Sequence, residues 1–329
     1  MLNEKLKLNQ QIFSEGQSLI SLRDGLREAL LELAETDKNI IVLTADLAES
    51  LQLQEFSRKF PDRFFDCGVA EQNMVGIASG LAASGKIPFI GSYAVFSPGR
   101  NWEQIRTAIC YNNVPVKIIG GHAGLMTGPD GATHQATEDL ALMRVLPNMQ
   151  VFAPGDALET KRIVKAAAYT RLPAYIRLAR PVVPSLTSLE TPFEVGRIYV
   201  FWEHEAPQAS IISCGPMTYY ALFAAQALAQ ENINVEVLHC PTIKPCDTKT
   251  IIDHTKVSGV LVTVEDHQIA GGLGSLVAEC LVQEYPLPME FVGVKDRFAE
   301  SGQPEELFDK YELQAEDIVA AVKRTLKRK

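Results

Sequence analysis

The chain has 329 residues, which at about 150 residues per domain corresponds to roughly two domains, each large enough to bury a core. Hydrophobic residues make up 47% of the chain and charged residues 22%, which excludes a disordered protein, a collagen-like repeat and a coiled-coil rod. Forty acidic and 31 basic residues leave a net charge of −9, without the basic stripe of a nucleic-acid-binding protein. We expect neither a nucleic acid nor a membrane as partner.

The cysteines are scattered, without Cys-x-x-Cys pairs or the Cys/His spacing of a zinc site. They are Cys67, Cys110, Cys214, Cys240, Cys246 and Cys280. No uncharged apolar stretch reaches about 18 residues, and the N-terminus has no apolar signal segment. These features predict reduced, mostly buried thiols in a cytoplasmic protein with no metal site.

The first half of the chain alternates helical and extended patterns. Apolar residues in 22–34 recur at helical spacing, and the apolar run 40–43 predicts a strand buried on both faces of a parallel sheet. Further helices are expected at 69–83, 101–108, 138–144 and 157–170, and further strands near Phe64 and at 87–90, 114–119, 150–153 and 174–178. The alternation predicts a doubly wound α/β domain over 21–180, after an N-terminal extension, 1–20.

The segment 181–207 interrupts this pattern with several prolines and is predicted to be a linker. A second, smaller series follows, with strands expected at 209–213, 234–238, 259–264 and 289–292 and helices at 218–230, 247–256, 274–284 and 315–326. We therefore predict an α/β fold of two tandem doubly wound domains, the second over 208–329.

In such folds ligands bind beyond the carboxyl ends of the strands, so the loops after the strands are the candidate sites. The loop 120–135 holds five glycines, two histidines and an aspartate. Glycine-rich segments lose much entropy on ordering, which favours a function over a long surface turn. Glu71, at a helix start, is equally compatible with a functional carboxylate and one placed by the helix dipole. Tyr93 and Phe96 taken alone are more typical of core aromatics than of a stacking platform.

Phosphate-binding glycine motifs are missing: the sequence has neither Gly-x-x-x-x-Gly-Lys-Ser/Thr nor Gly-x-Gly-x-x-Gly after a first strand. The nearest glycine cluster is 271–274, which opens a predicted helix and could cradle an anion. Because this cluster follows Glu265 and Asp266, a helix cap or a packing turn is the favoured interpretation.

Three runs carry a family resemblance: 66–74 (DCGVAEQNM), 130–135 (DGATHQ) and 146–149 (LPNM). They resemble the transketolase family of thiamine-diphosphate enzymes, over nearly the whole chain from about Leu22. The resemblance implies the family's pyrimidine-binding domain followed by its C-terminal domain. The Gly-Asp-Gly…Asn motif, with which the family binds the cofactor's diphosphate and metal, is missing. The resemblance therefore implies half an enzyme, as in split transketolases.

Carried over by position, the resemblance implies a cofactor pocket. Glu71 matches the carboxyl group that hydrogen-bonds the ring nitrogen N1′ of the aminopyrimidine, a contact that needs the carboxyl to carry a proton. Phe96 matches the aromatic residue that stacks on the pyrimidine, with Tyr93 as a weaker match, and Asp46 and Leu47 match a pair that lines the pocket. The implied cofactors are thiamine diphosphate and Mg²⁺, with the metal and diphosphate held mainly by a partner chain.

The resemblance also implies a substrate site. His134 and Asp130 match residues that hydrogen-bond the substrate, and His134 is implied in catalysis together with Glu71. Four residues match the family's site for the substrate's terminal phosphate: Arg23, Ser50, His122 and Arg180. This set favours an anionic sugar, phosphorylated or sulfonated, because arginine offers paired donors. Arg177 competes with Arg180 for this role, and the sequence leaves that choice open.

The leading hypothesis is a small subunit of a split transketolase, which transfers a two-carbon ketol unit from an anionic ketose to an aldose. A cofactor held by two chains implies a large, diphosphate-binding partner, and a two-fold axis would give a heterotetramer of two large and two small subunits. The alternatives are the β subunit of a 2-oxo acid dehydrogenase, the C-terminal half of a deoxyxylulose-phosphate-synthase-like enzyme, and a structural or regulatory paralogue. The run 97–100 (SPGR) departs from the acidic or bulky residues usual in the family, which affects the expected shape of the substrate channel.

Overall fold

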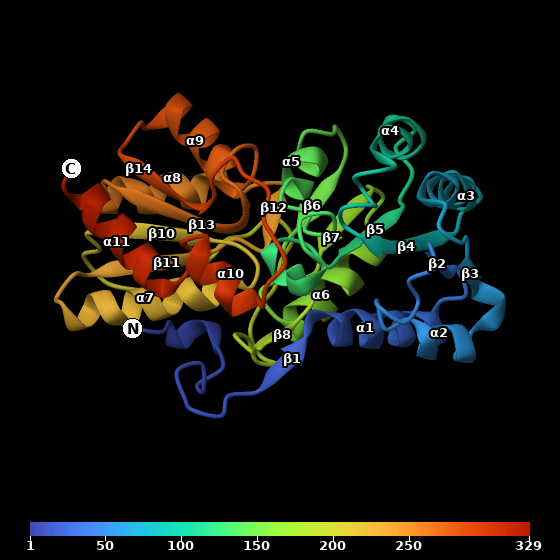
Figure 1. Cartoon of the computed structure of the whole chain (residues 1–329), viewed down its shortest axis with the longest axis horizontal. Helices are drawn as coiled ribbons and strands as arrows, with labels where there is room; N and C mark the ends of the chain where they lie inside the picture. The colour runs from blue at the N-terminus through green and yellow to red at the C-terminus, as the bar shows by residue number, and fades with distance from the viewer.

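The structure is a computed structural model that describes all residues, 1–329. Two β-sheets lie next to one another along the longest axis of the molecule, and helices cover both faces of each (Figure 1). The predicted α/β fold with two tandem doubly wound domains is confirmed. The parallel strands of each sheet point their carboxyl ends toward one edge, so the loops that follow them are brought together there.

The first sheet has seven strands in the order β12-β6-β7-β5-β4-β2-β3. Six of them come from the first domain: β2 (Ile40–Thr44), β3 (Phe64–Asp66), β4 (Ile87–Tyr93), β5 (Lys117–Gly121), β6 (Gln150–Phe152) and β7 (Ala174–Arg177). These six are parallel, whereas β12 (Thr242–Lys244) arrives from the second half and pairs antiparallel with β6. β5 starts later than the expected strand 114–119, because Pro115 has no N–H to donate to a ladder.

Helices cover this sheet on both sides. They are α1 (Leu22–Thr36), α2 (Gln54–Lys59), α3 (Glu71–Ala83), α4 (Trp102–Gln104) with its π-helical continuation η3 (Ile105–Tyr111), α5 (Asp139–Arg144) and α6 (Ala157–Ala168), with 3₁₀ turns η2 (Pro61–Arg63) and η4 (Leu125–Asp130). Side chains on a strand alternate between the two faces. Accordingly Val42 packs in one cluster with Leu26 of α1, while Leu43 packs in a second cluster with Met74 of α3.

The second sheet has five strands in the order β14-β13-β10-β11-β9, parallel except for β9 at one edge. Its strands are β9 (Tyr199–Trp202), β10 (Ala209–Ser213), β11 (Val235–His239), β13 (Leu261–Gln268) and β14 (Met289–Val294). Its helices are α7 (Met217–Gln230), α8 (Thr248–Ser258), α9 (Leu273–Glu284), α10 (Pro304–Lys310) and α11 (Ala315–Leu326).

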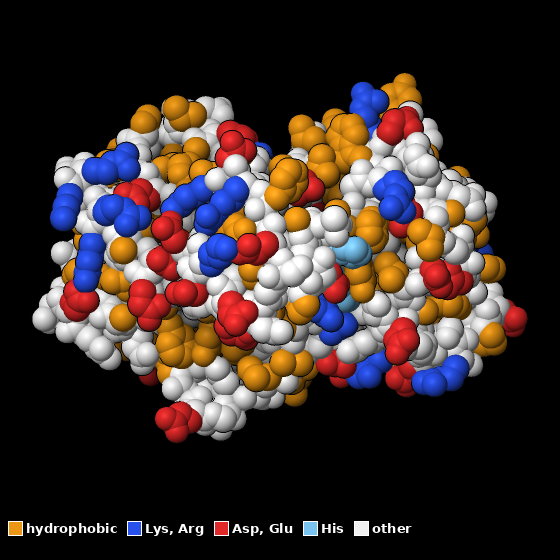
Figure 2. Space-filling view, in the orientation of Figure 1, with side chains coloured by type: hydrophobic (Ala, Val, Ile, Leu, Met, Phe, Trp, Pro, Cys, Tyr) orange, Lys and Arg blue, Asp and Glu red, His pale blue; other side chains and the backbone are white.

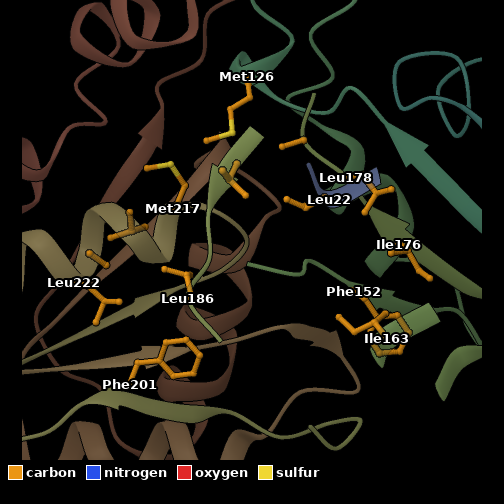
Figure 3. Packing of buried hydrophobic residues seen from close by; sticks show 14 of the residues in the cluster. Leu22, Met126, Phe152, Ile163, Ile176, Leu178, Leu186, Phe201, Met217 and Leu222 are labelled. Carbon is orange, nitrogen blue, oxygen red and sulfur yellow. The ribbon is translucent and has the colours of Figure 1, made fainter. Parts of the chain in front are cut away.

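The two domains share their cores. The larger hydrophobic cluster contains Phe152 and Ile163 of the first domain together with Phe201 and Met217 of the second (Figure 3). Leu186, between the two domains, belongs to the same cluster. This continuous burial fixes the two sheets relative to one another.

The two segments that flank the first domain, 1–20 and 181–207, contain short strands that the sequence did not predict. The segment 181–207, predicted as a linker from its prolines, contains β9 and also β8 (Val182–Pro184). The extension 1–20 includes the 3₁₀ turn η1 (Glu4–Leu6) and leads into β1 (Leu19–Ser21), which pairs antiparallel with β8. These strands are only three or four residues long and pair with distant segments, so they leave no periodic pattern in the sequence.

On the face shown in Figure 2, basic and acidic side chains are interspersed over both domains. No helix of the structure combines the length and apolar character needed to cross a membrane. All six cysteines are free thiols.

Candidate active site

The residues expected to form a site gather beyond the carboxyl ends of the first sheet. Asp46 and Leu47 follow β2, Tyr93 ends β4, His122 follows β5 and Arg180 follows β7. These four strands are parallel neighbours, so their carboxyl ends lie at one edge of the sheet. In the half of the molecule formed by this domain, histidine atoms reach the surface beside hydrophobic side chains (Figure 2).

Four aromatic rings form a cluster at this edge. Tyr93 stacks on His122, with ring centroids 3.9 Å apart and an angle of 19° between the planes. Phe96 lies nearly parallel to Tyr93 at 6.2 Å, and His134 directs its ring at Phe96 edge-on, with 5.4 Å between centroids. The structure thus brings these four predicted residues together, although they come from two separate loops, one after β4 and one after β5.

Glu71 is the first residue of α3 and is only 1% exposed. Its Oε2 accepts a hydrogen bond of 2.7 Å from Nη1 of Arg100, whose Cζ lies 4.8 Å from the centroid of the Phe96 ring. The backbone carbonyl of Glu71 accepts a hydrogen bond from the buried side chain of Asn101. The sequence assigned no role to Arg100, because nothing in the order of residues shows that it faces Glu71, 29 positions earlier.

Two arginines expected to bind an anion lie close together. Arg23 donates to the carbonyl oxygens of Ser50, at 2.8 Å, and Arg180, at 2.7 Å, and Arg180 donates to the carbonyl of Thr127 at 3.0 Å. The Tyr93 hydroxyl donates a hydrogen bond of 3.2 Å to the Ser50 hydroxyl. Burial, and next the neighbouring charge of Arg180, lower the pKa of Arg23. Since neither arginine is paired with a carboxylate, the pair favours an anionic ligand.

His122 adds a neutral group to this site. It is 2% exposed, its backbone adopts the left-handed conformation with φ of 52°, and its Nδ1 has no hydrogen-bond partner. Burial, reinforced by the charges of Arg23 and Arg180, lowers its pKa to about 3. The imidazole is therefore uncharged at neutral pH and can donate or accept one hydrogen bond at each nitrogen according to its tautomer.

The remaining expected residues lie at the rim of the site. Asp130 is exposed at the end of η4, and Nδ1 of His134 bonds to the hydroxyl of its neighbour Thr133 at 2.8 Å. Asp46 is exposed and Leu47 is half-buried against the core. No hydrogen bond joins the carboxylate of Asp130 or Asp46 to the aromatic cluster.

Arg177 does not belong to the anion-binding pair. It is buried, and its Nε lies 3.0 Å from Oδ2 of Asp139, which also accepts a hydrogen bond from Tyr175. Although burial lowers the pKa of Arg177, the charges of Asp139 and Asp266 outweigh it and leave the pKa raised. Between the two arginines that competed in the sequence, Arg180 is the one adjacent to Arg23.

The second domain contacts the glycine-rich loop 120–135 of the first. Oδ1 of Asp266, at the end of β13, accepts a hydrogen bond of 2.8 Å from the backbone N–H of Leu125. A Cβ at Gly124, where φ is 74°, would lie 2.0 Å from Asp266, so only glycine permits this approach. Arg177 donates to the backbone carbonyl of Asp266 at 2.6 Å. The sequence signal was the acidic pair before 271–274, which we interpreted as part of a helix cap or a packing turn.

The helix-cap interpretation is confirmed for Glu265, the residue before Asp266. Both carboxylate oxygens of Glu265 accept hydrogen bonds from the first backbone N–H groups of α9, those of Leu273 at 2.7 Å and Gly274 at 2.8 Å. The helix start is therefore capped from within the chain. No group of three or more His, Cys, Asp or Glu side chains in the structure could hold a metal ion.

Comparison with known families agrees with this arrangement. The chain matches the model of the transketolase pyrimidine-binding domain over residues 18–185 and that of the transketolase C-terminal domain over residues 199–318. This chain belongs to the transketolase family. The first match contains all the residues gathered at the sheet edge, and the second contains Asp266.

Several relatives of this transketolase-family chain have nearly the same length. A putative transketolase C-terminal section from Methanocaldococcus jannaschii is 40% identical over 93% of this chain and 96% of its own length. A 6-deoxy-6-sulfo-D-fructose transketolase subunit from a Clostridium species is 37% identical, over 94% and 95%. A solved structure of a split-gene transketolase, an inactive β4 tetramer, is 47% identical with a TM-score of 0.87, covering 94% of this chain and 99% of that one.

Proposed function

We propose that this chain is the small subunit of a split transketolase, which transfers a two-carbon ketol unit from an anionic ketose to an aldose. The observation that carries the proposal is the space between Glu71 and Phe96. One planar side chain, that of Arg100, contacts the Glu71 carboxylate and the Phe96 ring at once. The carboxylate and the ring therefore face a common space that accepts a planar group with hydrogen-bond donors.

The residues present fit the pyrimidine end of thiamine diphosphate. A buried carboxyl group beside an aromatic face provides one hydrogen bond and one stacking surface, which are what an aminopyrimidine needs. Glu71 and Phe96 would hold that ring, with Tyr93, Asp46 and Leu47 around it. When bound, thiamine diphosphate supplies the electron sink for breaking the carbon–carbon bond of the ketose. The role of Glu71 is to hold a proton at the pyrimidine ring nitrogen.

The other residues of the site would bind and orient the sugar. Arg23, Arg180 and the neutral imidazole of His122 would hold the terminal anion, with the Ser50 hydroxyl as a further donor. His134, which lies in the aromatic cluster, would hydrogen-bond sugar oxygens near the reacting carbons. Asp130, exposed at the end of η4, would be a further hydrogen-bonding group for the sugar. Binding of the remote anion would position the reacting end of the ketose.

A partner chain would supply the rest of the site. We propose that a large subunit holds the diphosphate and Mg²⁺, in a heterotetramer of two large and two small subunits. The names of the relatives support this division, since they describe a C-terminal section, a subunit and a split-gene enzyme whose β4 tetramer is inactive. The relative that acts on a sulfonated sugar supports an anionic ketose as donor.

Reconstitution tests the proposal. The purified chain is expected to be inactive alone and to catalyse ketol transfer when mixed with a large subunit carrying Gly-Asp-Gly…Asn, thiamine diphosphate and Mg²⁺. A ketose phosphate and a sulfonated ketose should serve as donors, and pyruvate should not. Glu71→Ala in the complex should lower kcat by at least about 100-fold, because it removes the proton-holding group. Glu284→Ala, an exposed glutamate of α9, is the matched control.

Each alternative function predicts a different result in the reconstitution experiment. Pyruvate as the preferred donor would identify a relative of the deoxyxylulose-phosphate synthase or the 2-oxo acid dehydrogenase β subunit. A complex that assembles but binds no thiamine diphosphate in calorimetry would identify a structural or regulatory paralogue. Full activity of the Glu71→Ala complex would contradict the role given to Glu71.

A further inference from the structure

Arg100 makes both of the contacts that the proposed cofactor site offers to the aminopyrimidine. Its Nη1 lies 2.7 Å from Oε2 of Glu71, and its Cζ lies 4.8 Å from the centroid of Phe96. We infer that in the subunit without cofactor Arg100 occupies the place of the aminopyrimidine. Its side chain must rotate away from Glu71 and Phe96 before the cofactor can bind. This inference rests on the proposed function and adds a residue that governs cofactor entry.

The backbone that carries Arg100 is held in place. A Cβ at Gly99 would lie 1.9 Å from the carbonyl oxygen of Val95, so the turn is too tight for any other residue there. The next residue, Asn101, is fully buried and donates from its Nδ2 to the Glu71 carbonyl at 3.2 Å and to the Ser97 hydroxyl at 3.1 Å. Because the turn is fixed on both sides, Arg100 can leave only by rotation of its side chain.

The side chain itself is free to rotate. That of Arg100 is 46% exposed, whereas that of Glu71 is 1% exposed. An ion pair with one half-exposed partner is screened by water, so it yields to a ligand more readily than a fully buried pair does. The contact between Arg100 and the Phe96 ring is likewise open to solvent on the arginine side.

The ion pair also has a function in the free subunit. A buried carboxylate without a partner is strongly destabilising, and Arg100 is the only cation that contacts Glu71. The guanidinium and the pyrimidine nitrogen would compete for the same buried carboxyl group. Departure of Arg100 therefore leaves Glu71 free to bond the pyrimidine as the cofactor enters.

The first experiment measures the dissociation constant of thiamine diphosphate by calorimetry in the reconstituted complex with Mg²⁺. If the arginine occupies the site in most molecules, its removal increases the fraction that is ready to bind. Arg100→Ala should therefore lower the Kd by about three- to tenfold. Arg58→Ala, which removes an exposed arginine of α2, should leave the Kd unchanged.

The second experiment needs no cofactor and remains informative if Arg100→Ala folds poorly. In the free subunit, Arg100→Gln should lower Tm by a few degrees, because it leaves the Glu71 carboxylate unpaired. The same substitution in a Glu71→Gln background should lower Tm by much less, since no charge is left to compensate. Calorimetric scans of the single and double variants at pH 7.5 provide this comparison.

The outcomes separate the two proposals. A wild-type complex that binds thiamine diphosphate as tightly as, or more tightly than, the Arg100→Ala complex would overturn the inference and leave the proposed function standing. No binding by either complex would overturn both. An equal loss of Tm from Arg100→Gln in both backgrounds would show that the ion pair does not stabilise the free subunit, and would also overturn the inference.

Discussion

Tyr93 and His122 stack face to face, with 3.9 Å between ring centroids, although they end or follow two different strands. The stack covers His122 on one side, while Arg23 and Arg180 approach it closely enough to act on its charge. The tyrosine also reaches the Ser50 hydroxyl with its own oxygen. One aromatic residue thereby connects the proposed cofactor side of the site to its proposed anion-binding side.

His122 should make the stability of the subunit depend on pH in a defined direction. Its native pKa of about 3 lies below the ordinary value of 6.5, so below pH 6.5 the unfolded chain binds a proton that the native chain does not. The free energy of unfolding should therefore fall as the pH falls from 6.5 toward 3. Relative to His122→Asn, the wild type should lose about 1.5 kcal/mol between pH 6.5 and pH 5 in urea denaturation.

Asparagine is the appropriate replacement at this position, because it tolerates the positive φ of 52° and does not titrate. Wild type and variant with parallel stability curves over this pH range would show that the native fold does not lower the pKa of His122. Histidine NMR signals give a direct check, since the His122 ring should not titrate between pH 5 and 8.

Arg177 and Arg180 should respond differently to the same substitution. Arg177→Met breaks a buried pair with Asp139 and should destabilise the chain by about 3–5 kcal/mol, seen as a large fall in Tm. Arg180→Met should change Tm little and raise KM for a ketose phosphate about 10- to 100-fold, because a charged hydrogen bond to the anion is lost. If instead Arg177→Met folded normally and raised KM, the assignment of the two arginines would be reversed.

Asp266 should affect catalysis although it lies in the second domain. Asp266→Asn replaces one acceptor oxygen with a donor, so a backbone N–H of the loop at Leu125 or Met126 loses its partner. We expect a destabilisation of about 1–3 kcal/mol, a lower kcat and faster proteolysis within 124–135. Asp62→Asn, at an exposed aspartate, is the control. Unchanged kcat with lower Tm would limit Asp266 to a structural role.

Much of the fold could be predicted from local pattern. The helix at 22–34 and the strand at 40–43 appear in the structure as α1 (Leu22–Thr36) and β2 (Ile40–Thr44). Strand β12 could not be predicted, because three residues give no periodicity and its partner β6 lies about 90 residues earlier in the chain. Strand β9, within the proline-containing segment 181–207, could not be predicted either, because it has only four residues and pairs with the distant β11.

The site shows the same division. From the sequence alone it follows that Glu71, Phe96, His122 and Arg180 come after parallel strands and therefore meet at one edge of a sheet, because strand and helix periods are local properties. Only the tertiary structure decided that Arg100 faces Glu71, that Arg180 rather than Arg177 joins Arg23, and that Asp266 fixes the loop at Leu125. The residues of these pairs are 29 to 157 positions apart in the sequence and meet only because the packed elements direct their side chains toward one another. The local periodicity of the sequence contains no information about such contacts.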